Sequence, residues 1–320
     1  MYIIKMVKTE KIKYTETCSI NKEKHYKLII LIIASQTDYY DNFNKCWKEY
    51  MNIFPDVKSF FLYSDENMEC DLLVSDDTIT YKCEESYIPG ILFKTLAAYQ
   101  FCQNHLSYDF ILRTNLSSFI HITRLLKYLD STPKNEVVCC KLEHFPLLCD
   151  DENVNKEAVD KTLKKWLMSS NDITTFQNKK DDWKIYTKTL DLFFGYRNFM
   201  DNKFVHYFAG SFILFSNDVI HKLVDKIVID NVLSKASITT IPDDIVISAI
   251  AQLPGIQPSN LIDIEKFSHR CIYEEKPKHY TDDLFFIRNR TDKIYGNRDI
   301  DVKNFIEQVR EYYNPNFMEN

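Results

Sequence analysis

A continuous apolar run near the start of the chain constrains the fold more than any other feature. Residues 28–34 read Leu-Ile-Ile-Leu-Ile-Ile-Ala, without one polar side chain. This length and richness in isoleucine are typical of a strand that is covered on both faces, as in a parallel sheet. The run is too short to cross a bilayer, which takes about 20 residues, and it lies too far along the chain for a usual signal peptide. We therefore expect a buried strand and no membrane span.

The segments that follow alternate between helical and strand patterns. Between residues 40 and 52, Phe43, Trp47 and Met51 recur at a spacing of four, which predicts a helix with one buried face. Residues 57–63 predict a second strand, so the order strand, helix, strand indicates a right-handed crossover and a parallel sheet. Further strands are expected at 108–112, 137–142, 205–208 and 212–215, and further helices at 91–105, 122–129, 220–227, 245–253 and 302–312.

Length and composition are compatible with one large domain. The chain has 320 residues, of which 45% are hydrophobic and 14% aromatic, which is ample for a large core. Residues 1–23 are polar and rich in lysine, and we expect them to form a loose arm. Residues 149–203 are charged and only locally periodic, and we interpret them as an insertion or lid. Residues 24–320, with this insertion, are predicted to form a single domain.

Charge, glycine content and cysteine spacing exclude several classes of protein. The formal net charge is −6, so the chain lacks the basic excess that neutralises phosphates in nucleic-acid-binding proteins. With only 5 glycines, it contains neither a GxGxxG nor a GxxxxGKS/T motif. Its 9 cysteines are irregularly spaced and form no CxxC pair, which is typical of thiols in a reducing compartment. We therefore predict a cytoplasmic protein without a nucleic-acid partner.

Polar residues follow three of the predicted strands, at 35–38, 64–67 and 113–118. Ligands of open α/β sheets bind beyond the carboxyl ends of the strands, so these groups are expected to converge on one crevice. Each group alone is also compatible with a simple turn. The third group contains no glycine, proline or aspartate, and a predicted helix follows it. A helix N-terminus favours anions such as a diphosphate; alternatively, Ser117 or Ser118 is an ordinary N-cap.

Six short stretches carry a resemblance to a known family. They are Lys-Cys-Trp at 45–47, Phe-Phe-Leu-Tyr-Ser-Asp at 60–65, Lys-Thr at 94–95, Tyr-Asp-Phe-Ile-Leu-Arg-Thr-Asn-Leu-Ser-Ser-Phe at 108–119, Ala-Gly-Ser-Phe-Ile-Leu-Phe-Ser at 209–216 and Ile-Pro-Asp-Asp-Ile-Val at 241–246. In this order, from residue 35 to about residue 255, the chain resembles the fringe-like and β-1,3-galactosyltransferase-like glycosyltransferases of GT-A fold. The resemblance implies an α/β fold with a Rossmann-like mixed sheet, mainly parallel, and flanking helices.

The resemblance also implies a site for a nucleoside diphosphate sugar, with UDP as the expected nucleotide. Arginines near the C-terminus add charge suited to phosphates, because the guanidinium fork pairs well with phosphate oxygens. For these arginines the alternative is ordinary solvated surface charge. The expected donor-binding residues are Ser35, Asp65, Lys94, Arg113, Asn115, Ser117, Arg288 and Arg290.

The metal-binding aspartates of that family are missing from this chain. The resemblance places the aspartate triplet on Asn115, Leu116 and Ser117, whereas a hard cation prefers several carboxylate oxygens. Three interpretations remain open: the enzyme uses no metal, it holds a weakly bound Mn²⁺ or Mg²⁺, or the site is inactive. The first is favoured because arginines can neutralise the diphosphate; the candidates are Arg113, Arg288, Arg290 and Arg298. In the second, Asn115 and Ser117 would bind the ion with help from Asp65 and His279.

Two adjacent aspartates are the candidates for the catalytic base. Inverting transfer needs a carboxylate within hydrogen-bond reach of the acceptor hydroxyl, and the resemblance places that carboxylate in the Asp243–Asp244 pair. We favour Asp244 over Asp243. The alternative is structural: Asp243 as the N-cap of the following helix and Asp244 in its first turn.

These observations predict an inverting glycosyltransferase that moves a sugar from a nucleoside diphosphate sugar to a glycan or another hydroxyl acceptor. A second hypothesis is a catalytically inactive module of the same fold that binds a sugar nucleotide or a glycan. The lost aspartates favour the module, and the retained acidic pair favours the enzyme. A third hypothesis, another nucleotide-binding α/β enzyme, is disfavoured by the missing glycine loops. The sequence does not indicate an oligomeric state.

Overall fold

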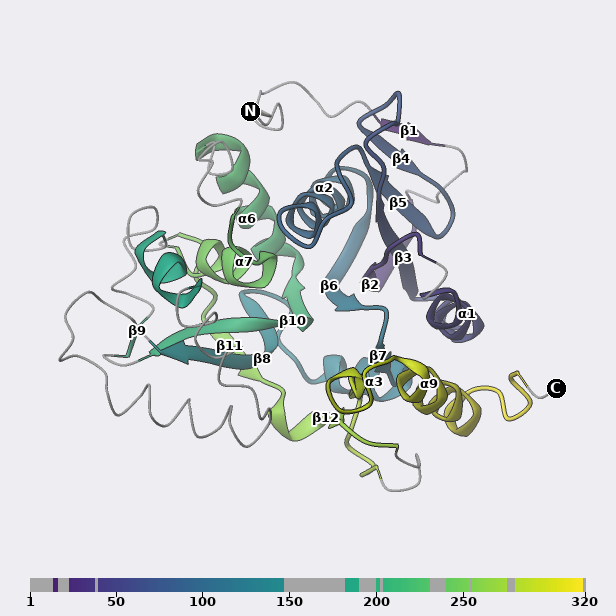
Figure 1. The fold of residues 1–320 in the computed structure, drawn as a ribbon. Helices are drawn as coiled ribbons and strands as arrows, with labels where there is room; N and C mark the ends of the chain where they lie inside the picture. The colour runs from purple at the N-terminus through teal and green to yellow at the C-terminus, as the bar shows by residue number, and fades with distance from the viewer. Residues whose placement is uncertain are drawn as a thin grey trace.

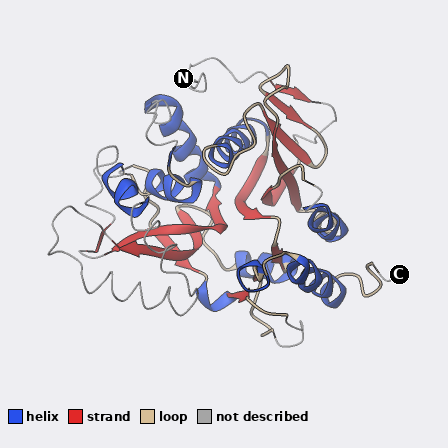
Figure 2. Ribbon diagram, viewed as in Figure 1, coloured by secondary structure: helices blue, strands red, loops and turns tan. Residues whose placement is uncertain are grey.

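The computed structural model of the chain describes most of the predicted domain. The described residues are 14–16, 23–37, 40–146, 182–189, 200–201, 204–230, 240–253, 255–274 and 280–318. They form a ten-stranded mixed sheet, a second sheet of three strands, and helices packed against them (Figures 1 and 2). The α/β class that the sequence predicts is therefore confirmed.

The apolar run at 28–34 lies at the centre of the large sheet. It belongs to strand β2 (His25–Ile33), which pairs in parallel with β3 (Val57–Ser64) on one side and β6 (Ser107–Asn115) on the other. The full strand order is β1-β4-β5-β3-β2-β6-β10-β8-β11. The remaining strands are β1 (Tyr14–Glu16), β4 (Leu72–Val74), β5 (Thr78–Tyr81), β8 (Val137–Pro146), β9 (Met200–Asp201), β10 (Phe204–Ser216) and β11 (Asn260–Asp263).

The connections reverse direction at β2. The chain moves from β2 outward to β3 and β5, and it then returns to the other side of β2 to form β6. The sheet is mixed, because β10 runs antiparallel to both β6 and β8 on one side of β2, and β4 runs antiparallel to β5 on the other. Such a reversal opens a crevice at the carboxyl ends of the strands, where ligands of α/β proteins bind. The ends of β2 and β6 are therefore the place to look for a site.

Helices cover both faces of the large sheet (Figure 1). The helices α2 (Gly90–His105), α6 (Asn217–Asp230) and α7 (Asp243–Ala251) contribute to one hydrophobic cluster. The helices α1 (Asp41–Tyr50), α3 (Ile122–Asp130) and α9 (Asp299–Tyr312) contribute to the other. Alternate residues of β2 face the two clusters, which explains why the strand is continuously apolar from residue 28 onward.

Aromatic residues of α1 hold the segment that follows β6. The Trp47 ring stacks on Tyr50 with 5.2 Å between centroids, and Tyr50 stacks on Tyr313 at 4.6 Å. The indole N–H of Trp47 donates a 2.8 Å hydrogen bond to the carbonyl oxygen of Leu116. Since this N–H is buried, the bond fixes the backbone immediately after β6.

Two predicted strands form one strand. Residues 205–208 and 212–215 both belong to β10, whose pairing with β8 shifts register between Phe208 and Ile213. The sequence pattern breaks at this irregularity, which contains Gly210. Likewise β6 does not end at residue 112, because its pairing with β2 continues as far as Asn115. Arg113 and Asn115 are thus strand residues, and the alternative of a simple turn is wrong for this part of residues 113–118.

A short strand separates residues 113–118 from the helix that follows. Strand β7 (Ser118–Ile120) pairs antiparallel with β13 (Phe286–Asn289), which pairs in parallel with β12 (Ser268–Cys271). Helix α3 begins only at Ile122, with His121 as its N-cap. Neither Ser117 nor Ser118 is therefore a helix cap, and the predicted anion site at a helix N-terminus is wrong. The three-residue strand is too short to give a pattern that sequence analysis detects.

Other short elements lie at the borders of the predicted regions. Within the expected N-terminal arm, residues 14–16 form β1, which pairs in parallel with β4; residues 1–13 and 17–22 lie outside the described part. Most of the predicted insertion at 149–203 also lies outside it, and residues 182–189 form a helix. Two further elements complete the described fold, the short helix α8 (Asp292–Tyr295) and a 3₁₀ turn at Glu265–Phe267. Among the described helices none is both long and apolar enough to cross a bilayer.

Candidate functional site

A buried ion pair joins β6 to the start of α7. Nη2 of Arg113 lies 2.5 Å from Oδ2 of Asp243, and the two residues expose only 2% and 4% of their surface. Asp243 is the first residue of α7, and the N-cap is Pro242. The capping role that we considered for Asp243 is therefore wrong, because its carboxylate binds an arginine that is 130 positions away in the sequence.

Arg113 retains hydrogen-bonding capacity that the described residues do not use. Its Nε and Nη1 atoms are buried and have no hydrogen-bond partner within the described part of the chain. A buried donor without a partner costs about 1–3 kcal/mol. Such groups are rare in folded proteins and call for an explanation, for which a ligand or a water molecule is a common answer.

Asp244 lies beside this pair and is partly exposed. Its Oδ2 atom accepts a 3.2 Å hydrogen bond from the backbone N–H of Gly210, and its Oδ1 atom accepts one of 3.0 Å from that of Ile245. The pKa of Asp244 is raised to about 7, first by burial and then by the negative charge of Asp243, while Arg113 and the N–H groups of Gly210 and Ile245 lower it. A reachable carboxyl with a pKa near neutrality is suited to accept a proton.

Gly210 permits the close approach of the two charged side chains. A Cβ atom at this position would lie 2.6 Å from Nη1 of Arg113 and 3.0 Å from Cβ of Asp244. Both distances are too short for ordinary packing. The absence of a side chain at Gly210 therefore lets β10 approach Arg113 and Asp244 closely, at the point where the register of β10 shifts.

Three tyrosines from separate elements lie within electrostatic range of Asp244. The negative charge of Asp244 contributes to the raised pKa values of Tyr87, Tyr186 and Tyr207, although burial of each hydroxyl is the larger cause. Tyr87 precedes α2, Tyr186 lies in the helix at 182–189, and Tyr207 lies in β10. Sequence analysis missed all three. The chain contains 20 tyrosines, and no local pattern distinguishes these three from the others.

Arginines of the small sheet lie next to the segment that follows β6. Nη1 of Arg288 donates hydrogen bonds to the hydroxyl of Ser117 at 2.6 Å and to that of Ser118 at 3.2 Å. Burial lowers the pKa of Arg288 to about 9, and the positive charges of Arg290, Arg298 and Arg270 also lower it. Arg270 was not among the residues singled out from the sequence, because it stands alone in a segment without a recognisable motif.

Tyr87 connects the acidic pair with these arginines. Its pKa is raised to about 12 by burial of the hydroxyl and then by Asp244 and Asp243, while Arg113 and Arg290 lower it. Tyr87 as a whole residue is 67% exposed. One accessible residue therefore lies within electrostatic reach of both the acidic pair and Arg290.

Three other predicted donor-binding residues are Lys94, Asp65 and Ser35. The first two already form hydrogen bonds within the protein, and the third lies just beyond a strand end. Lys94 is only 1% exposed, and its ammonium donates to the carbonyl of Ala34 at 2.8 Å and to both carboxylate oxygens of Glu85 at 2.9 and 3.0 Å. These three bonds use every proton of the ammonium. The carboxylate of Asp65 accepts a bond of 2.9 Å from the backbone N–H of Asn67, as in a local turn. Ser35 is half-buried just beyond the end of β2.

The predicted ligands do not form a site suited to a divalent cation. The hydroxyl of Ser117 accepts a hydrogen bond from Arg288, whose positive charge would repel a cation bound there. Asn115 lies at the end of β6, and His279 lies outside the described residues. No group of three or more His, Cys, Asp or Glu residues in the described part could hold a metal ion. The residues present therefore do not fit the metal that the family resemblance would imply.

Comparisons with known proteins add no assignment. Neither the family models nor the curated sequences give a match to this chain. The interpretation of the site therefore rests on its own geometry and on the resemblance noted in the sequence.

Proposed function

We propose that this chain is a glycosyltransferase that moves a sugar from a nucleoside diphosphate sugar to a hydroxyl acceptor with inversion at the anomeric carbon. The observation that carries the proposal is the environment of Asp244. This carboxyl is partly exposed, has a pKa of about 7 and is oriented by the N–H groups of Gly210 and Ile245. Asp243 is buried against Arg113 and cannot reach a substrate, so we assign the role of base to Asp244.

The proposed reaction is a single displacement. Asp244 accepts the proton of the acceptor hydroxyl, and the acceptor oxygen forms a bond to the anomeric carbon. The bond from that carbon to the diphosphate oxygen breaks, and the diphosphate leaves with the electron pair. Positioning of the two substrates and stabilisation of the departing charge would contribute most of the rate. Arg288, which donates hydrogen bonds to Ser117 and Ser118 just after β6, and its neighbour Arg290 are the cations that we propose to stabilise that charge.

The tyrosines around Asp244 support an acceptor with an apolar face and several hydroxyl groups. A tyrosine offers an apolar ring together with a polar hydroxyl at its tip. Sugars present the same combination. Because Tyr87, Tyr186 and Tyr207 all lie within electrostatic reach of Asp244, we propose that the acceptor sugar binds among them.

The decisive experiment is the substitution Asp244→Asn. A thermal-shift screen of nucleotide sugars first identifies the donor, because a ligand of the native state raises the melting temperature. With that donor, we expect Asp244→Asn to lower kcat by about 10²- to 10⁴-fold, the usual contribution of a general base, and to leave the donor Kd nearly unchanged. Asp225→Asn is the matched control, since Asp225 is an exposed carboxylate on α6. Turnover of Asp244→Asn at the wild-type rate would exclude this base.

The second candidate is an inactive module of the same fold, and the missing metal-binding aspartates favour it. Donor binding without hydrolysis or transfer, measured with the same donor and a panel of sugar acceptors, would identify the module. A cytoplasmic location belongs to the proposal as well. The seven cysteines in the described part form no disulfide with one another, which is compatible with a reducing compartment.

A further inference from the structure

We propose that the arginine-bearing face of the small sheet binds the diphosphate of the donor directly, without a divalent cation. This face consists of Arg270 on β12 and of Arg288 and Arg290 on and after β13, with Arg288 held by the buried hydroxyl of Ser118 on β7. The proposal deepens the proposed function and rests on it for the identity of the ligand. The binding of phosphate groups can be tested separately from sugar transfer.

The register of the small sheet brings these groups to one face. Arg270 lies opposite Arg288 in the parallel ladder between β12 and β13, and Arg288 lies opposite Ser118 in the antiparallel ladder between β13 and β7. Directly opposed residues project to the same side of a sheet, and a residue two positions further on projects to that side as well. Arg290 follows the last residue of β13, and its backbone N–H donates a 3.1 Å hydrogen bond to the carbonyl oxygen of Cys271 on β12, so the pairing continues to Arg290 and places it in the same row.

The positive charge of this face exceeds the negative charge that is bound to it. Arg298 pairs with the buried carboxylate of Asp301, and Nε of Arg290 lies 3.6 Å from Asp292. Within the described residues, Arg270 and Arg288 have no carboxylate at ion-pair distance. Glu143 and Asp292 attract Arg270 only from further away. Asp301, which already binds Arg298, attracts Arg288 in the same way. Two guanidinium groups thus remain without a carboxylate in direct contact. The diphosphate of a sugar nucleotide, with one negative charge on each phosphate, matches this excess.

The like charges are held together by structural contacts. Ser117 and Ser118 accept hydrogen bonds from Arg288, and Asp301 accepts a bond of 2.6 Å from the backbone N–H of Thr291 while it binds Arg298. Mutual repulsion among arginines opposes this arrangement, so a packed cluster is typical of a site where an anion supplies the missing charge. Burial is the main cause of the lowered pKa values of Arg288 and Arg270, and repulsion from neighbouring arginines lowers both further.

The same geometry explains why no cation is needed at this position. Ser117 is the third member of the triplet that corresponds to the family's metal-binding aspartates, and here its hydroxyl binds a guanidinium. Arg288 thus stands where the positive charge of the metal would act. A divalent cation would meet repulsion from Arg288 and would find no carboxylate in the triplet.

The test is calorimetry of the full chain with inorganic pyrophosphate, in EDTA and again with Mn²⁺ or Mg²⁺. We expect the same Kd with and without metal. Arg270→Gln should weaken binding about 10- to 100-fold, because a charge-assisted hydrogen bond is lost. Arg270 is exposed, so this substitution should not disturb folding. Lys134→Gln is the matched control: it removes one positive charge beside Asp109, near the amino end of β6.

Two outcomes would overturn the proposal: pyrophosphate that binds only with added metal, or an Arg270→Gln variant that binds as tightly as the wild type. Arg288→Lys is a second variant that keeps the charge and loses the fork, and we expect about a 10-fold weaker Kd from it. Metal-independent pyrophosphate binding without any sugar transfer would reject the proposed function but would still support the phosphate-binding site. Transfer that requires Mn²⁺ would retain the function and reject this site.

Discussion

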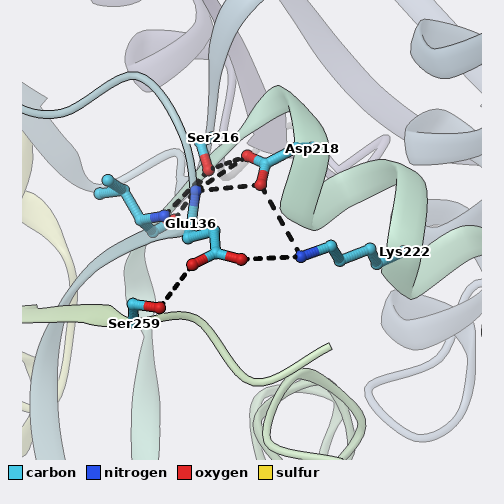
Figure 3. A network of polar contacts seen from close by, with 6 residues as sticks. Glu136, Ser216, Asp218, Lys222 and Ser259 are labelled. Carbon is cyan, nitrogen blue, oxygen red and sulfur yellow. Dashed lines mark hydrogen bonds and ion pairs between the residues drawn. The ribbon is translucent and has the colours of Figure 1, made fainter. Parts of the chain in front are cut away.

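Two polar clusters lie towards opposite ends of β6, and they are built in opposite ways. The acidic pair Asp243–Asp244 contacts Arg113 and Gly210, close to the carboxyl end of β6. The second cluster, which we call the Glu136 cluster, lies where β10 ends beside Phe110, near the start of β6. It consists of Glu136, Ser216, Asp218, Lys222 and Ser259 (Figure 3).

In the Glu136 cluster the polar groups satisfy one another. The backbone N–H of Glu136 donates to both carboxylate oxygens of Asp218 at 3.0 Å, and the hydroxyl of Ser216 donates to Asp218 at 2.6 Å. The carboxylate of Glu136 accepts bonds from Ser259 and from Lys222 (Figure 3). The hydroxyl of Ser259 and the ammonium of Lys222 lower the pKa of Glu136, so its charged form is stabilised. This cluster holds β8, β10 and α6 together, and it has no feature of a binding site.

In the acidic pair and its partner Arg113, by contrast, the polar groups do not fully satisfy one another. Burial and a neighbouring like charge raise the pKa of Asp244, and two atoms of buried Arg113 have no partner among the described residues. A cluster that only held the fold together would avoid both costs. The comparison teaches that incomplete satisfaction of buried charges, rather than the presence of charged residues, distinguishes the candidate site.

The largest difference should appear when each cluster loses its cation. We expect Arg113→Gln to lower the free energy of unfolding by about 3–5 kcal/mol, because it leaves the buried carboxylate of Asp243 without its partner. Urea unfolding followed by circular dichroism measures this loss. The double variant Arg113→Gln with Asp243→Asn should recover part of it. No recovery in the double variant would show that the two side chains do not depend on each other.

Gly210→Ala should have the next largest effect. The added methyl group would meet Arg113 at 2.6 Å, so the arginine must move and its contact with Asp243 must weaken. Overpacking of this kind costs about 1–3 kcal/mol, and we expect a comparable loss in unfolding free energy together with reduced turnover. Gly255→Ala is a poor control because Gly255 has a φ of +87°. Ser211→Ala, on the same strand, is the better one.

The pH dependence should separate Asp244 from the exposed carboxylates. Its pKa is about 7 in the folded chain against 3.8 in the unfolded one, so the native state binds more protons between these values. The free energy of unfolding should therefore fall by roughly 1–3 kcal/mol as pH rises from 4 to 7. Asp244→Asn should remove this contribution, and Asp225→Asn should retain it. Turnover should rise through pH 7 as Asp244 loses its proton, in the opposite direction to stability.

The smallest effect is expected in the Glu136 cluster. Lys222→Gln removes an exposed ion pair, which contributes little to stability in water. We expect the melting temperature to fall by less than about 2 °C, with no change in turnover. A large loss of activity in Lys222→Gln would contradict the purely structural role of the Glu136 cluster, because it would show that this cluster contributes to the proposed reaction.

Local periodicity predicted the main elements well. The helices α1, α2, α3, α6, α7 and α9 and the strands β2, β3, β6 and β8 all lie within a few residues of their expected positions. The strands β7, β12 and β13 were not predicted, since three or four residues cannot establish a pattern. That omission mattered for the site, because these strands carry Arg270 and Arg288 to Ser117 and Ser118.

The amino-acid sequence by itself determined the central strand, the alternating α/β order and the acidic pair at the start of α7. These properties follow from neighbouring residues, whose pattern is visible without a fold. Only the tertiary structure decided which aspartate of the pair is reachable. Asp243 is distinguished from Asp244 by an arginine 130 positions away, and the raised pKa of Asp244 arises from burial. Both depend on long-range packing, which no stretch of neighbouring residues encodes.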